Sequence, residues 1–292
     1  MRTCIDCIPC FFRQALEAVR LVSDDEAMAE HVLRELTMLV KDVDMDQSPP
    51  AMGQKIHRLV RATVGMDDPY RRIKARFNEV ALRMYPEMRR LIRASEWPLG
   101  TAVRLAIAGN IIDFGVNGGV QESDLEKAIS ECLAADFADG QLALFQEAVN
   151  GAEEILYLAD NAGEIVFDRL LIELLPMEKI TVVVKGGPII NDATMEDAVV
   201  AGLPRIVEVI DNGDDAPGTL AASCCEAFRQ RFERADLIIA KGQGNFETLS
   251  DVDKHIFFIL RAKCPVIARR LACPVGTSVL LEHKTIEHKT VN

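Results

Sequence analysis

The chain has 292 residues, with 33 basic and 45 acidic side chains and a formal net charge of −12. Hydrophobic residues make up 49% and charged residues 27%, a globular composition that excludes disordered, collagen-like and coiled-coil chains. The negative charge, without any block of five or more lysines and arginines, disfavours nucleic acid as a partner. Small molecules and metal cations fit this charge better.

The sequence predicts neither a membrane segment nor an oxidising environment. No apolar run approaches the roughly 18 to 20 residues that span a bilayer, and the longest runs, 155–159 and 255–260, have the length of strands. The N-terminus lacks the apolar stretch and cleavage site of a secretory signal. Eight cysteines are too sparse for a disulfide scaffold. We therefore expect a soluble cytoplasmic protein with no membrane partner.

The first half of the chain is predicted to be helical. Apolar residues recur at helical spacing from residue 9 to about 150. Pro9 and Asp68-Pro69 mark the starts of two of these helices, whereas Pro86 is expected to bend or interrupt the second. Residues 99–112 form a further, mostly apolar helix.

After residue 150, short apolar runs alternate with helical segments, which predicts a parallel sheet covered on both faces. The expected strands are 155–158, 180–184, 206–209, 237–240, 256–260 and 266–268. The expected helices are 164–175, 194–201, 219–233 and part of 245–254. We predict an α/β fold with a helical domain at residues 1–150 and an α/β domain at residues 151–292.

Polar residues follow the predicted strands at the edge where such sheets bind ligands. Asp160 and Asn161 offer hard oxygen ligands, and Gly163 turns the chain into a helix whose free N–H groups favour an anion. Asp192 follows the second strand and is placed to complete a metal site. Another strand ends in residues 241–247, which add a lysine, glycines and an amide. These loops predict a metal beside a phosphate in one crevice.

Each segment alone has a simpler interpretation. Asp and Asn readily cap helices and form turns, so Asp160-Asn161 alone indicates a turn. The pattern Gly242-x-Gly244-x-x-Glu247 resembles a dinucleotide fingerprint but has glutamate in place of the third glycine, and the chain contains no P-loop sequence. Because three separate strands end in polar loops with glycines, we favour a shared site.

Cys4, Cys7 and Cys10 form a separate group at positions i, i+3 and i+6. Three thiols on one turn suit a metal ion or redox chemistry but do not close a tetrahedral site. A ferredoxin-type run is excluded because position 14 is Gln. The alternative is that the three side chains pack as small hydrophobic residues. Cys264 and Cys273 are distant candidates for a fourth ligand.

Polar residues also interrupt the apolar stretch after residue 104. Asn110 and Asp113 lie three residues apart, and hence on one face of a helix. On such an apolar helix they need polar partners, either within the core or in the crevice.

Seven motifs occur in one order along the chain: Cys4-x-x-Cys7-x-x-Cys10, Pro49-Pro50-x-x-Gly53, Asp68-Pro69-Tyr70-x-x-x-Lys74, Gly109-Asn110-x-x-Asp113, Asp160-Asn161-x-Gly163-Glu164, Asn191-Asp192-x-Thr194 and Lys241-Gly242-x-Gly244-Asn245-x-Glu247. This series resembles the DUF89 family of damage-control phosphatases with an ARMT1-like fold, in its cysteine-bearing prokaryotic branch. The resemblance covers nearly the whole chain. It implies a helical N-terminal region joined to a three-layer α/β/α sandwich with a mostly parallel, Rossmann-like sheet.

The resemblance also implies an activity and a set of site residues. The activity is metal-dependent hydrolysis of phosphate monoesters such as sugar phosphates or damaged phosphometabolites. The metal ligands are Asp160, Asn161 and Asp192. The residues expected to contact substrate are Asn110, Asp113, Gly163, Glu164, Lys241, Gly242, Asn245 and Glu247.

We expect Mg²⁺, Mn²⁺, Co²⁺ or Ni²⁺ to bridge a phosphoryl oxygen and the attacking water, because oxygen ligands select hard ions. In this scheme Lys241 stabilises the equatorial phosphoryl oxygens, and Asp113 or Asp192 orients the water.

Three other functions compete with this one. An aspartyl-phosphate enzyme of the haloacid dehalogenase type needs a second Asp two residues after Asp160, but residue 162 is Ala. An S-adenosylmethionine-dependent carboxyl methyltransferase, a role proposed for some relatives, is disfavoured because no G-x-G loop follows the first strand. A non-catalytic metal-binding protein would bind the cation but turn over no phosphate ester.

Overall fold

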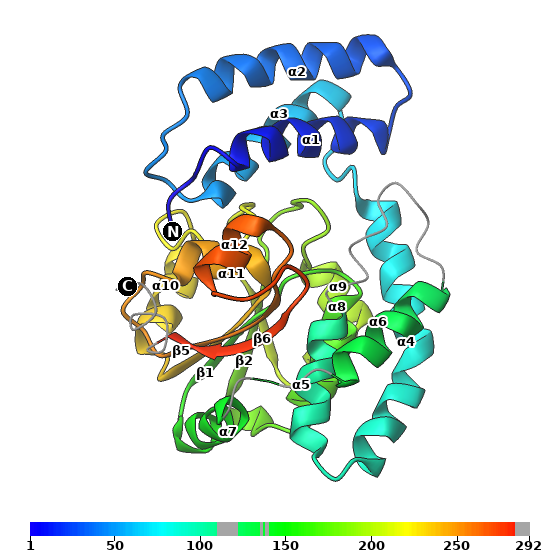
Figure 1. Cartoon of the computed structure of the whole chain (residues 1–292), viewed down its shortest axis with the longest axis vertical. Coiled ribbons are helices and arrows are strands. Elements are labelled where there is room, and N and C mark those ends of the chain that lie inside the picture. Colours follow the sequence, from blue (N-terminus) through cyan, green and yellow to red (C-terminus); the bar gives the residue numbers. More distant parts are fainter. Residues whose placement is uncertain (110–121, 135–136, 138–139, 284–292) are drawn as a thin grey trace.

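The computed structural model describes residues 1–109, 122–134, 137 and 140–283. Helices α1 to α3 form a bundle at one end of the molecule, and a six-stranded sheet with its covering helices forms the remainder (Figure 1). The helices are α1 (Cys7–Arg20), α2 (Glu26–Lys41), α3 (Pro49–Val64), α4 (Arg71–Ala94), α5 (Pro98–Gly109), α6 (Glu122–Ala134), α7 (Gln141–Gly151), α8 (Glu164–Ile172), α9 (Met195–Val200), α10 (Glu226–Arg234), α11 (Gly242–Leu249) and α12 (Pro265–Arg270). The strands are β1 (Ile155–Leu158), β2 (Ile180–Val184), β3 (Glu208–Asp211), β4 (Leu237–Lys241), β5 (Ile256–Arg261) and β6 (Ser278–Glu282). Within these described parts, no helix is both long and apolar enough to span a membrane.

The strands lie in the order β3-β2-β1-β4-β5-β6. The first five are parallel, and β6 pairs antiparallel with β5. Every residue of β1, β2 and β4 is buried, which explains why these strands read as continuous apolar runs. The predicted α/β class with a mostly parallel sheet is therefore confirmed.

The C-terminal part of the sheet differs from the prediction. Residues 266–268, expected to form a strand, belong to α12, because Pro265 occupies the first turn and starts a helix. The edge strand β6 was not predicted. Its residues pair with β5, so only a partner from elsewhere in the chain gives them extended structure.

Two helices also differ from the prediction. Of the two predicted effects of Pro86, an interruption is wrong, because α4 continues from Arg71 to Ala94. Pro86 is exposed, while Met84 and Met88 on the opposite face are buried and hold the helix against the core. The predicted helix 219–233 begins only at Glu226, because the preceding loop approaches the sheet edge and the side chain of Thr219 is used there.

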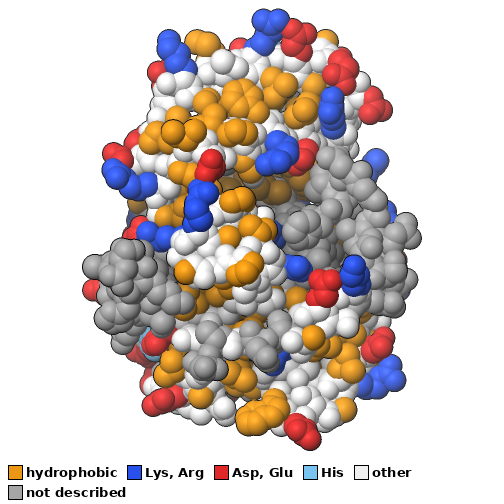
Figure 2. Space-filling view, viewed as in Figure 1, with side chains coloured by type: hydrophobic (Ala, Val, Ile, Leu, Met, Phe, Trp, Pro, Cys, Tyr) orange, Lys and Arg blue, Asp and Glu red, His pale blue; other side chains and the backbone are white. Residues whose placement is uncertain are grey.

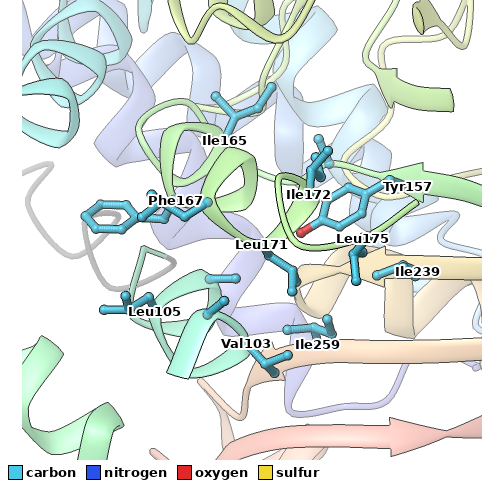
Figure 3. Packing of buried hydrophobic residues seen from close by; sticks show 14 of the residues in the cluster. Val103, Leu105, Tyr157, Ile165, Phe167, Leu171, Ile172, Leu175, Ile239 and Ile259 are labelled. Atoms are coloured by element: carbon cyan, nitrogen blue, oxygen red, sulfur yellow. The ribbon is translucent and has the colours of Figure 1, made fainter. Parts of the chain in front are cut away.

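Hydrophobic clusters cover both faces of the sheet. On one face, side chains of α5 and α8 pack against the strands, as seen for Val103 and Leu171 beside Ile259 (Figure 3). Helices α10, α11 and α12 cover the other face. Helices α4 to α7 share the first cluster with the strands, whereas α1 to α3 surround a cluster of their own.

The α1–α3 bundle docks on the carboxyl edge of the sheet through α3, beside a hollow in the surface (Figure 2). Gln54 Nε2 donates to Asp214 Oδ1 at 2.7 Å, and Arg61 Nη1 donates to the carbonyl oxygen of Pro188 at 2.5 Å. Ile190 packs against the bundle's hydrophobic cluster and has a φ of 45°. A β-branched residue is strained in this left-handed region, so the bundle contacts help to hold the 186–194 loop in its observed conformation.

His57, on the buried side of α3, predicts an acid-sensitive fold. Burial, together with the charge of Arg61, lowers the pKa of His57 from 6.5 to about 4. The folded state therefore favours the neutral imidazole, and its contribution to stability is complete above pH 6.5 and lost as the pH falls to 4. His57→Phe keeps a ring beside Tyr70 but has no group that titrates. When the pH falls from 7 to 4, we expect the free energy of unfolding, measured in urea, to decrease by about 3 kcal/mol less in this variant than in the wild type. Equal losses in the two proteins would contradict this assignment.

Candidate active site

The candidate site lies at the carboxyl edge of β1 and β4. These strands are neighbours in the sheet, but the chain continues from β1 toward β2 and from β4 toward β5. Such a divergence opens a crevice beyond the carboxyl ends of the strands, where parallel sheets bind their ligands. The segments that follow both strands carry residues singled out from the sequence, so the topology brings them to one place.

Backbone hydrogen bonds gather the three predicted metal ligands. Asn161 and Asp192 form an isolated antiparallel bridge. Ala193 N donates to the carbonyl oxygen of Asp160 at 2.7 Å. The side chains of all three ligands lie on segments that are almost fully buried, with 9%, 5% and 4% of Asp160, Asn161 and Asp192 exposed. Segments 30 residues apart in the sequence therefore present two carboxylates and an amide together.

The side chain of Asn161 is held on both sides. Its Nδ2 donates to Asp160 Oδ2 at 2.7 Å and to Glu164 Oε2 at 2.9 Å. Gly242, with a φ of 80°, lies against the carboxylate of Asp160. A Cβ at position 242 would overlap with this carboxylate. The glycine therefore makes room for the Asp160 side chain. This cradle and the oxygen donor set both suit a hard divalent cation.

Lys241 does not lie on the wall of the crevice. Its Nζ is fully buried and donates to Glu164 Oε1 at 2.6 Å, Asp168 Oδ1 at 2.6 Å and the carbonyl oxygen of Ala106 at 2.8 Å. These three acceptors use all three N–H groups of the ammonium. The expected contacts of Lys241 and Glu164 with substrate are thus not favoured by this geometry, because both side chains are occupied below the surface.

No role is predicted for Asp168 from the sequence, although its spacing from Glu164 could have indicated one. It lies four residues after Glu164 in a mostly apolar helix, so the two carboxylates share one helical face. Burial raises the pKa of Asp168 to about 6, while Lys241 acts in the opposite direction. Burial acts to lower the pKa of Lys241, but the carboxylates of Asp168 and Glu164 raise it above its usual value.

Lys185 is a second buried cation at the sheet edge, directly after β2. Its Nζ lies 3.5 Å from Asp192 Oδ2 and donates to the carbonyl oxygen of Gly218. Only 4% of Lys185 is exposed, and Gly186 packs against the backbone of Gly213, so the segment is tightly packed.

Gly163 and Asn245, two residues predicted to bind substrate, have structural partners. Gly163 N donates to Asn78 Oδ1 at 2.7 Å, so the amide of the residue that caps the start of α8 is already used. Asn245 accepts a hydrogen bond from Thr219 Oγ1 at 2.8 Å and donates to the carbonyl oxygen of Lys241 at 2.8 Å. These bonds connect the loops that surround the crevice.

The remaining predicted residues lie elsewhere or outside the described chain. Asn110 and Asp113 lie outside the described residues, and their predicted role stays a prediction. Glu247 is on the face of α11 that also carries Gln243, which donates to its Oε1 at 2.9 Å. Burial raises the pKa of Glu247 to about 7. The amino group of Met1 donates to the backbone carbonyl oxygen of Glu247 at 2.6 Å, so Glu247 lies beside the N-terminal segment of the chain.

Cys4 and Cys7 come together at the start of α1, with their Sγ atoms 3.5 Å apart. Burial raises the pKa of Cys7 to about 12. Cys264, one of the two distant candidates, accepts a hydrogen bond from Gln243 at 3.7 Å. Among the described residues, no three or more His, Cys, Asp or Glu side chains are grouped to hold a metal ion. The metal or redox role of Cys4, Cys7 and Cys10 stays a prediction.

A separate pocket of about 520 Å³ lies at the opposite, amino edge of the sheet. Its charged side chains pair with one another, as Arg231 does with Glu208 at 2.6 Å and Lys179 with Glu153 at 3.2 Å. None of the predicted site residues lines it.

The chain is similar to known proteins over nearly its whole length. A family model described as the damage-control phosphatase ARMT1-like domain matches residues 3–279. The chain belongs to this family. It is 36% identical over 290 residues to a damage-control phosphatase of Pyrococcus horikoshii, covering 97% of this chain and 99% of that protein. It is 37% identical over 279 residues to a damage-control phosphatase of Archaeoglobus fulgidus, covering 94% and 96%.

A solved structure supports the same assignment. The crystal structure of a DUF89 family protein from Pyrococcus horikoshii matches with a TM-score of 0.87 and 34% identity, covering 97% of this chain and 99% of that chain. The resemblance to DUF89 proteins and the α/β fold that it implied are thereby confirmed. The family and its named relatives identify this ARMT1-like protein as a phosphatase.

Proposed function

We propose that this damage-control phosphatase hydrolyses phosphate monoesters of small metabolites, such as sugar phosphates or damaged phosphometabolites, with a divalent metal ion held by Asp160, Asn161 and Asp192. The observation that carries the proposal is the meeting of these three buried oxygen ligands at the carboxyl edge of the sheet, after β1 and β2. Mg²⁺, Mn²⁺, Co²⁺ and Ni²⁺ all suit such a donor set.

The bound ion would supply positive charge to a phosphoryl oxygen and lower the pKa of a water molecule. The chain itself supplies a second positive charge at Lys185, which is buried beside Asp192. We assign to Lys185, rather than to Lys241, the stabilisation of charge that develops on the phosphoryl oxygens. Asp192 accepts a hydrogen bond from the attacking water and orients it.

The free cysteines support the cytoplasmic location that we propose. All eight are free, including the closely spaced Cys4 and Cys7. Free thiols in this number fit a reducing compartment such as the cytoplasm.

The test is hydrolysis of p-nitrophenyl phosphate by chelator-treated protein, with each of the four ions restored separately. We expect turnover only with an ion present, and a loss of about 100-fold or more in kcat/KM for Asp160→Ala, because charge stabilisation by the metal contributes several kcal/mol. Asp42→Ala, which removes an exposed carboxylate at the end of α2, is the control and should retain activity.

Two results would contradict the proposal. One is equal turnover of wild-type protein with and without a metal ion. The other is full metal-dependent turnover by Asp160→Ala. Binding of the ion without turnover of any ester across a panel of phosphorylated metabolites would instead support a non-catalytic metal-binding protein.

A further inference from the structure

The buried charges beneath the crevice call for a functional explanation. Lys241, Glu164 and Asp168 are fully buried, although removing charged groups from water is costly. Apolar residues of similar volume often stabilise a protein as well as such a group or better, so stability alone is a weak reason for it. The contacts of this group with the proposed metal ligands offer a better reason for it.

Glu164 connects the buried charges to the crevice. Its Oε1 accepts a hydrogen bond from Lys241 at 2.6 Å, and its Oε2 accepts one from Asn161 Nδ2 at 2.9 Å. The same Nδ2 donates to Asp160 Oδ2 at 2.7 Å. If the amide were turned over, its oxygen would face two carboxylate oxygens at these distances and would be repelled. The two acceptors therefore allow only one orientation of the amide.

We propose that Glu164 and Lys241 are positioning residues that orient the Asn161 amide so that its oxygen is available to the metal ion. Lys241 anchors one oxygen of Glu164, and the other oxygen anchors the amide nitrogen of Asn161. Asp168 Oδ1 holds Lys241 from the other side at 2.6 Å. This inference rests on the proposed metal site, but it assigns to Glu164 and Lys241 a role other than contact with substrate.

The decisive variant is Glu164→Gln. In a glutamine, an NH2 group takes the place of one of the two carboxylate oxygens, so only one of the positions that face Lys241 and Asn161 Nδ2 still carries an acceptor. We expect the affinity for Mn²⁺, measured by isothermal titration calorimetry on the full chain, to fall about 10- to 100-fold, as is usual when a partner of a metal ligand is removed. The visible absorption spectrum of the Co²⁺-loaded protein should change as well, because the amide oxygen is no longer held in place.

Tyr157→Phe is the matched control. Tyr157 donates to Asp168 Oδ1 at 2.8 Å and is fully buried, but it contacts neither Glu164 nor Asn161 through a hydrogen bond described in the structure. The substitution removes a buried hydrogen bond from the same network but leaves the hydrogen bond between Glu164 and the Asn161 amide in place. Its Mn²⁺ affinity should stay within about twofold of wild type, and its Co²⁺ spectrum should be unchanged.

Glu164→Asp keeps the experiment decisive if the glutamine variant does not fold. The shorter carboxylate still balances Lys241 but is drawn away from Asn161, so the same loss of affinity is expected. Wild-type affinity in the folded Glu164 variant, or an equal loss in Tyr157→Phe, would overturn the positioning role. Failure of the wild-type protein to bind Mn²⁺, or unchanged binding by Asp160→Ala, would instead overturn the metal site itself.

Discussion

Replacing Gly242 by alanine is expected to remove nearly all phosphatase turnover. An alanine Cβ would overlap with the Asp160 carboxylate, meeting Oδ1 at 2.5 Å and Oδ2 more closely still. Because Asp160 follows a buried strand, its carboxylate has to rotate out of the site to avoid the methyl group. We expect a loss of about 100-fold or more in kcat/KM for p-nitrophenyl phosphate, the upper range for disturbing the support of a metal ligand.

Gly65→Ala separates this effect from backbone strain. Gly65 caps α3 with a φ of 68°, close to the 80° of Gly242, but a Cβ there meets no atom within 4 Å. Both alanines therefore carry the cost of a left-handed conformation, about 1 kcal/mol. Only Gly242→Ala should lose Mn²⁺ affinity and turnover. Equal activity in the two variants would show that Asp160 does not depend on this close approach.

Replacing Lys241 by methionine is expected to cause the largest loss of stability. The change leaves the carboxylates of Glu164 and Asp168 fully buried without their cation. Removing one partner of a buried ion pair costs about 3–5 kcal/mol, a large part of the roughly 5–15 kcal/mol that stabilises a typical protein. The free energy of unfolding, measured in urea with a chelator present, gives the size of this loss.

The loss should depend on pH in a defined direction. Burial already raises the pKa of Asp168 to about 6, and the variant loses the opposing effect of Lys241. A carboxyl group with a raised pKa in the folded state stabilises the fold when protonated, and this contribution is lost as the pH rises through the folded-state pKa. The deficit should therefore be larger at pH 8 than at pH 5. Lys55→Met, at an exposed position on α3, is the control. A deficit independent of pH would argue against a charged pair.

The strands and the site differ in how far the sequence predicts them. The buried strands β1 and β2 have the predicted bounds, because residues buried on both faces must be apolar throughout. Residues 266–268 were assigned to a strand because a short apolar run suits either structure, and the helix start at Pro265 decided the outcome. The order β3-β2-β1-β4-β5-β6 depends on pairing between distant segments, which local patterns do not encode.

In the site, too, some residues are placed correctly from local sequence patterns, whereas others depend on contacts between distant segments. The sequence predicts that Asp160, Asn161 and Asp192 come together, because strand ends meet at one edge of a parallel sheet. The sequence placed Lys241 in a phosphate pocket, since a lysine beside glycines is typical of an anion-binding loop. Its burial depends on two carboxylates from α8, about 75 residues earlier in the chain, and on the carbonyl oxygen of Ala106. That the ammonium group of Lys241 already has three acceptors becomes visible only in the folded structure, where these three segments meet.

The contact of Ile190 with the α1–α3 bundle has a consequence for protein engineering. The strained loop that carries Asp192 is held by residues on a bundle that precedes it by more than a hundred positions in the chain. A minimal enzyme made by trimming the first 64 residues would keep every proposed metal ligand yet lose the surface that holds one of them. The three N-terminal helices are therefore not a detachable module, and shortened or chimeric versions need to retain them with their own α3 contacts.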